Sequence, residues 1–163
     1  MLSGWHMTHL PVRVRSRPHP WKVVDEVIVS WATLTVEGFV LVPRLFGIPL
    51  ITRDDRVFLT SLGIEIEDKR QVQMKSRRWK TQAVRRDREF RRHPVVDQTG
   101  QLCGRVIDFL FDDKTWHVTH LVVSRGILGD LVSGALIVPI ADIMEMGHGV
   151  IKISRTGAPF SEK

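Results

Sequence analysis

The chain has 163 residues, of which 43% are hydrophobic and 26% are charged. This composition excludes a largely disordered chain, because enough apolar surface is present to offset the entropy lost on ordering. The formal net charge of +6 is compatible with an acidic partner but does not require one.

The N-terminal region gives no sign of a targeting segment. Residues 1–20 contain His, Arg and Pro but no apolar core, so we expect no secretory signal. The longest apolar run, residues 38–51, contains Arg44 and two prolines. It is also shorter than the roughly 20 residues that cross a membrane, so we expect no transmembrane segment. The single cysteine, Cys103, cannot form an internal disulfide, which favours a reducing cytoplasm and a partly buried packing role.

The sequence matches itself at shifts of 83, then 82, then 87 positions. The clearest matches place Pro11-Val12 on Pro94-Val95, Phe39-Val40-Leu41 on Leu121-Val122-Val123, and Leu50-Ile51 on Ile137-Val138. Five extra residues, 130–134, account for the last change of shift. Because the matches keep their order at a nearly constant offset, they predict a duplicated unit.

Both halves contain short runs of Val, Ile, Leu and Phe bounded by turn residues, which is the signature of β-strands. Asp112 to Thr115 predicts a hairpin turn, Ser30 to Thr33 occupies a similar place, and Asp97 to Gly100 predicts a second turn. A unit of about 65 residues is only marginally stable alone, so we expect the copies to pack on each other or on another chain. The predicted fold is all-β, with two small barrels in tandem that each enclose their own apolar interior.

The stretch between the repeats, residues 69–92, is strongly basic. It holds eleven Lys or Arg and two acidic residues, a net charge of +9, whereas the rest of the chain sums to −3. A helix there would place Val72, Trp79, Ala83 and Phe90 on one narrow face, and we expect a helical linker. Arg side chains bind phosphate, and Trp can stack on a base. The candidate residues for binding nucleic acid or another anion are Lys75, Arg77, Arg78, Trp79, Lys80, Arg85, Arg86, Arg88, Arg91 and Arg92.

Four interpretations of this basic stretch stay open. In the first, it is a solvated linker helix whose arginines pair with the acidic repeats, because charge runs usually form solvated faces. Alternatively it binds nucleic acid, an anionic membrane surface or an acidic protein.

A second candidate surface is the glycine-containing loop of residues 126–134. Its apolar side chains either pack in the core or between the repeats, or contact a partner, since exposed apolar patches mark interaction sites. These side chains are Ile127, Leu128, Leu131 and Val132.

No set of residues predicts catalysis, a metal or a cofactor. Asp25 and Asp108 occupy the same repeat position, which favours hydrogen bonding to nearby backbone or basic groups over a single active site. His117 and His120 are three apart in an expected strand and would point to opposite faces, so they cannot share one ion. The sequence also lacks a Gly-x-Ser-x-Gly turn and a phosphate-binding glycine loop.

The second repeat resembles the PRC-barrel family of small β-barrels. The matching stretches are "VVDQTGQLCGRVID" from Val95 to Asp108, "IVPIADI" from Ile137 to Ile143 and "GVIKI" from Gly149 to Ile153. The first repeat is a weaker match and has Trp21 where the second has Gly104. The resemblance implies a divergent PRC unit at 1–68, the basic linker at 69–92, a PRC unit at 93–155 and a tail at 156–163.

The resemblance further implies a non-enzymatic adaptor or assembly protein, because the family offers no shared catalytic residue to transfer. We therefore expect a cytoplasmic protein that uses its barrels for protein–protein contacts, with no cofactor. The alternative is an RNA- or DNA-associated protein that holds phosphates through residues 69–92.

Overall fold

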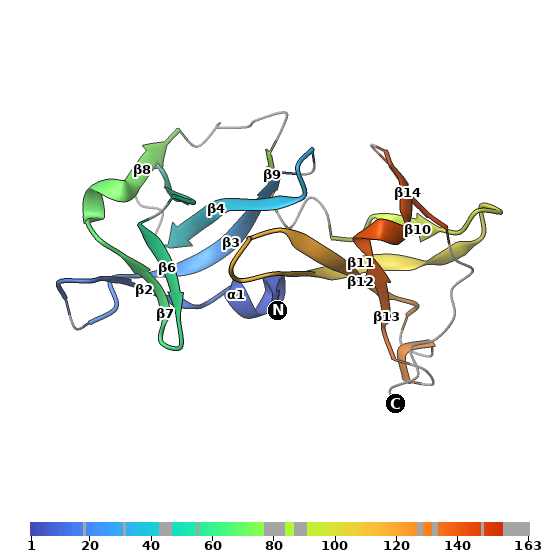
Figure 1. Ribbon diagram of the computed structural model, residues 1–163, viewed down its shortest axis with the longest axis horizontal. Coiled ribbons are helices and arrows are strands. Elements are labelled where there is room, and N and C mark those ends of the chain that lie inside the picture. The colour runs from blue at the N-terminus through green and yellow to red at the C-terminus, as the bar shows by residue number, and fades with distance from the viewer. Residues whose placement is uncertain are drawn as a thin grey trace.

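The computed structural model describes residues 1–17, 19–30, 32–42, 47–54, 56–76, 84–86, 91–126, 129–131, 134–147 and 149–154. These residues form mostly β-strands, as the sequence predicted. The strands belong to two curled sheets, one from each half of the chain, arranged along the long axis of the molecule (Figure 1).

The N-terminal sheet has eight strands, seven of which form a continuous path. Neighbours on this path are antiparallel except for one parallel pair, β2 with β7. The order along the path is β6 (Val57–Thr60), β7 (Gly63–Ile66), β2 (Pro11–Val14), β3 (Lys22–Ser30), β4 (Thr35–Val42), β5 (Ile48–Thr52) and β8 (Val72–Lys75).

The C-terminal sheet has seven strands, six of which follow the same path without a counterpart of β8. Its single parallel pair, β10 with β15, corresponds to β2 with β7. A short 3-10 helix, η2 (Ile140–Asp142), separates β13 from β14. The order is β14 (Ile143–Met146), β15 (Ile151–Ile153), β10 (Pro94–Val96), β11 (Leu102–Phe111), β12 (Val118–Ser124) and β13 (Leu136–Pro139).

The predicted turns are present, and single aspartates fix two of them. The Asp97 carboxylate accepts hydrogen bonds from the Thr99 hydroxyl at 2.6 Å and from the backbone N–H groups of Thr99 and Gln101 at 2.8 and 3.0 Å. Gly100 then takes a φ of +84°, which glycine adopts without steric cost. Asp112 accepts from the backbone N–H of Lys114 at 3.0 Å and of Thr115 at 2.7 Å, closing the β11–β12 hairpin.

The apolar interior is shared between the halves. One contiguous cluster of buried side chains includes Val27, Phe39 and Ile64 from the first half and Phe111 and Ile151 from the second. The expectation that each repeat would enclose its own interior is therefore wrong. The expectation that the two halves pack on each other is confirmed, which suits units too small to bury a large core alone.

Each half also lends a short strand to the other half. β1 (Leu2–Ser3) precedes the N-terminal sheet but pairs with β11, and β9 (Val84–Arg86) precedes the C-terminal sheet but pairs with β3. After β1, the short helix α1 (Gly4–Met7) lies against β11 and β3, with Met7 fully buried. In Figure 1, α1 lies beside the end of the β11–β12 hairpin. The exchange makes the two sheets interdependent.

The predicted helical linker is wrong wherever residues 69–92 are described. A 3-10 turn, η1 (Lys69–Gln71), leads into β8, which pairs with β5, and β9 pairs with β3. Of the predicted apolar stripe, Val72 packs against the shared core, while Trp79, Ala83 and Phe90 lie outside the described residues. Strand pairing prevails because sheet edges offer unpaired backbone groups, whereas like charges three or four apart destabilise a helix.

Candidate interaction surfaces

The two halves meet at a joint formed by the ends of their long hairpins. The N–H of Val36 donates to the carbonyl of Trp116 at 2.9 Å, and the N–H of Val118 donates to the carbonyl of Leu34 at 2.7 Å. Between them, Thr35 and His117 form an antiparallel bridge. At the shift of 82, Leu34, Thr35 and Val36 correspond to Trp116, His117 and Val118, so each contact made by one half has its equivalent made by the other. The joint thus has the reciprocal contacts of a two-fold dimer interface.

The joint has a matching backbone conformation on its two sides. Leu34 and Trp116, which are 82 positions apart, have φ values of +53° and +65°. Non-glycine residues rarely adopt this region, so surrounding contacts must hold them there. Trp116 supplies such contacts: its ring centroid lies 5.8 Å from that of Phe39 across the joint and 6.1 Å from that of Phe111 in its own half.

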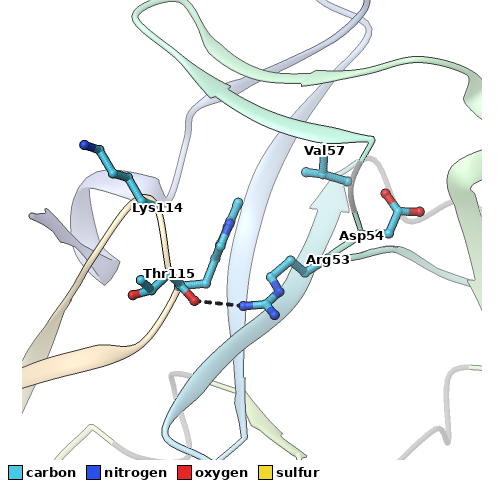
Figure 2. A pocket seen from close by; sticks show the side chains of 6 residues that line it. Arg53, Asp54, Val57, Lys114 and Thr115 are labelled. Atoms are coloured by element: carbon cyan, nitrogen blue, oxygen red, sulfur yellow. Dashed lines mark hydrogen bonds between the residues drawn. The ribbon is translucent and has the colours of Figure 1, made fainter.

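A polar pocket of about 420 Å³ opens beside the joint. Arg53 extends from the end of β5, and its guanidinium donates to the carbonyl of Thr115 at 3.1 Å, as the dashed line in Figure 2 marks. Lys114 lies on the hairpin turn that forms the opposite side of the pocket in that view. The pocket is lined by Arg53, Asp54, Val57, Lys114, Thr115 and Trp116.

Asp54 is the carboxylate among these lining residues, and its charge is compensated locally. It accepts from the guanidinium of Arg56 at 3.0 Å and from the Arg56 backbone N–H at 2.9 Å. The side-chain amide of Gln71 adds a third donor at 3.3 Å. The charges of Arg53 and Lys114 therefore dominate the pocket.

Sequence reasoning did not identify this pocket. Its residues come from two turns that are about 60 positions apart in the chain, and only the joint brings them together. A signal was nevertheless present, because the corresponding positions of the other repeat carry different chemistry. At the shifts of 87 and 82, Arg53 corresponds to Ile140 and Lys114 to Ala32.

The structure describes only some of the residues predicted to bind nucleic acid or another anion. Lys75 is half-buried on β8, Arg85 and Arg86 belong to β9, and Arg91 and Arg92 directly precede β10. The remaining predicted anion-binding residues, Arg77, Arg78, Trp79, Lys80 and Arg88, lie outside the described residues.

Two cations of the basic stretch lie over tryptophan rings. The Lys69 ammonium is 4.7 Å from the ring centroid of Trp21, and the Arg91 guanidinium carbon is 5.1 Å from that of Trp5. Lys22 also lies over Trp21, at 5.1 Å, and burial lowers the pKa of Lys22. Cations over aromatic faces are a stabilising contact, so part of the basic charge has a structural role.

The predicted loop surface is represented by Leu131, which is 79% exposed. Leu131 therefore does not pack in the core. Nearby, the Ser124 hydroxyl and the Arg125 backbone N–H bond the Asp130 carboxylate and lower its pKa. Ile127, Leu128 and Val132 lie outside the described residues.

Asp108 and Cys103, two further residues that the sequence analysis considered, lie in structural environments. Asp108 accepts from the Ser3 hydroxyl and from the Trp5 backbone N–H at 2.9 Å, as expected for a carboxylate that satisfies nearby backbone. Cys103 is partly buried, also as expected. Within the described ranges, no group of three or more His, Cys, Asp or Glu is placed to hold a metal ion.

The fold and these surfaces define a small all-β protein of two interlocked sheets. Residues 83–158 match the PRC-barrel domain family. This match agrees with the resemblance predicted from the sequence of the second half, and the matched range includes the exchanged strand β9. Comparison with curated proteins gave no match. None of the helices in the described part of the chain has the length and apolar content needed to cross a membrane.

Proposed function

We propose that the protein is a non-enzymatic adaptor or assembly protein that acts through protein–protein contacts. The PRC-barrel match at residues 83–158 carries this proposal, because such domains serve as interaction modules. The highly exposed Leu131, on the loop before β13 in that domain, offers an apolar contact point. The single cysteine of the chain suits a reducing compartment, and we place the protein in the cytoplasm.

The proposal includes a second, divergent PRC-type unit at residues 1–68. The common strand path of the two sheets and their corresponding parallel pairs support it. The reciprocal contacts at the joint support it further, since duplicated units tend to meet as the subunits of a symmetric dimer do. On this view the chain is a covalently linked dimer of PRC units that presents one surface per unit.

The adaptor role is tested by changing the exposed loop. The tagged wild-type chain should retain partner proteins after cross-linking in its native cell, and Leu131→Asp should not retain them. The new carboxylate would be buried in an apolar contact without a partner charge. Leu62→Asp is the matched control, since Leu62 is 60% exposed in a turn of the first half. Retention of the same proteins by both variants, at wild-type level, would contradict a loop-mediated contact.

The second candidate function is binding of RNA or DNA through residues 69–92. The concentration of a +9 charge in this stretch favours it, because each phosphate contact releases counterions. Filter binding across a salt series tests it, and affinity should fall steeply as salt rises. Changing Arg77, Arg78, Arg85 and Arg86 together to Gln should abolish retention and leave the circular dichroism spectrum intact. Unfolding of this variant would instead assign these arginines to the structure.

A further inference from the structure

We propose that the pocket beside the joint binds an acidic peptide segment of a protein partner, with Arg53 and Lys114 as the carboxylate-binding residues. This inference rests on the adaptor function proposed above and names the chemistry of the partner. Both cations belong to the pocket lining, yet they come from different halves of the chain.

The donors of the pocket are available for a ligand. The hydrogen bond from Arg53 to the Thr115 carbonyl uses one guanidinium nitrogen, Nη1, and a guanidinium carries five N–H groups. The side chain of Lys114 has no hydrogen bond or ion pair with another described residue, and its backbone N–H alone is used in the turn. Asp54, the carboxylate among the described lining residues, is bound to Arg56 instead of to either of these donors.

The opposite side of the joint provides an internal comparison. There the same backbone pairing is made, but Ile140 replaces Arg53, Ala141 replaces Asp54 and Ala32 replaces Lys114. Joining the two halves therefore does not require charged residues at these positions. Their presence on one side alone indicates a binding role in addition to the single tie from Arg53 to Thr115.

The arrangement of the cations favours a peptide over a small free anion. In Figure 2, Arg53 and Lys114 lie on opposite sides of the pocket and do not point toward one another. An extended chain with several acidic side chains can place a separate carboxylate at each of them. The volume of about 420 Å³ lies within the range of ligand pockets and admits more than one side chain.

The probe is a short acetylated and amidated peptide of alternating Glu and Gly, compared with the same peptide carrying Gln in place of Glu. Titration is followed by amide chemical shifts of the full chain and by calorimetry at about 150 mM salt, where exposed charges are screened beyond about 8 Å. The Glu peptide should shift the amides of Thr115 and Trp116, and the Gln peptide should bind at least about tenfold more weakly, as expected for lost charge-assisted hydrogen bonds.

The variants separate this pocket from the basic stretch. Lys114→Gln and Arg53→Gln should each weaken binding by about tenfold. Lys114→Gln carries the greater weight, because no described side-chain contact is lost with it. Arg17→Gln is the matched control, since it removes one positive charge from an exposed side chain outside the pocket, and it should leave the affinity unchanged.

Three results would overturn the assignment: no binding of the Glu peptide, shifts confined to residues 69–92, or equal losses in Lys114→Gln and Arg17→Gln. The adaptor function fails separately, if the tagged wild-type chain retains no protein after cross-linking in its native cell. Loss of partners in Leu131→Asp without peptide binding at the pocket would thus sustain the adaptor function and remove the pocket.

Discussion

Single side chains fix the turns of this protein, and Asp112 is the clearest case. Its carboxylate accepts from two backbone N–H groups and the Thr115 hydroxyl, so that the β11–β12 hairpin ends in a defined geometry. That geometry presents the carbonyl of Trp116 to the other half of the chain. The sequence "DDKT" was sufficient to predict this turn, because an Asp at the first turn position readily accepts hydrogen bonds from the backbone N–H groups that follow it.

Asp112 also makes stability depend on pH. The hydrogen bond from the Thr115 backbone N–H, then those from its hydroxyl and from Lys114, hold the pKa of Asp112 below its ordinary value. Because the folded pKa is lower than the unfolded value of about 3.9, the unfolded chain takes up the proton first as the pH falls. The stabilisation is fully present above about pH 5 and is lost as the pH falls through the folded pKa.

Asp112→Asn keeps an acceptor oxygen but does not titrate. We expect urea unfolding midpoints of this variant to fall less steeply than those of the wild type between about pH 5 and pH 3. Above that range the variant should be slightly less stable, because a neutral acceptor makes weaker hydrogen bonds. Parallel curves for the two proteins would show that Asp112 does not contribute to the acid sensitivity.

At the scale of elements, the informative feature is the exchange of β1 and β9 between the halves. Each is two or three residues long and too short to persist alone, yet each completes a ladder on a long central strand. β1 is held further by Asp108, which accepts from Ser3 and Trp5 at the start of α1. The first residues of the chain therefore act as a clasp on the C-terminal sheet.

Asp108→Ala should release this clasp. We expect a loss of about 1 kcal/mol in unfolding free energy and faster amide hydrogen exchange over residues 2–8, because two donors lose their acceptor. Asp113→Ala is a suitable control, since its side chain contacts the described part of the chain through one exposed ion pair, with the N-terminal amine at 3.7 Å. Equal exchange rates in the two variants would contradict the role given to Asp108.

At the scale of the whole molecule, the shared core leads us to expect that the two halves unfold as one cooperative unit. Trp116 lies at the centre of this coupling, because it packs on Phe39 of the first half and Phe111 of the second. Loss of its side chain would leave a gap in both halves at once. A chain of two independent barrels would behave differently, with each half unfolding at its own midpoint.

Trp116→Ala should destabilise the protein by about 3 kcal/mol, the lower end of the range for removing a large aromatic side chain, because Trp116 is only partly buried. Hydrogen exchange in β3–β4 and β11–β12 should accelerate by the same factor. Acceleration restricted to β11–β12 would show that the halves unfold separately.

The sequence alone determined the local features of this protein. Alternating apolar runs, turn aspartates and glycine at a positive φ act over a few residues, so the strands β4 and β12 and the turns at Asp97 and Asp112 were predictable. The PRC-barrel character of the second half was also readable, because its motif elements follow one another along the chain.

Tertiary structure alone decided which segments meet. The helix predicted for residues 69–92 gave way to β8 and β9, because free sheet edges elsewhere in the chain offered backbone partners that no local pattern reveals. The joint and its pocket likewise depend on two hairpins pairing across 82 positions. Propensity and periodicity describe neighbours in sequence, whereas the contact of Arg53 with Thr115 exists only once both sheets have formed and docked.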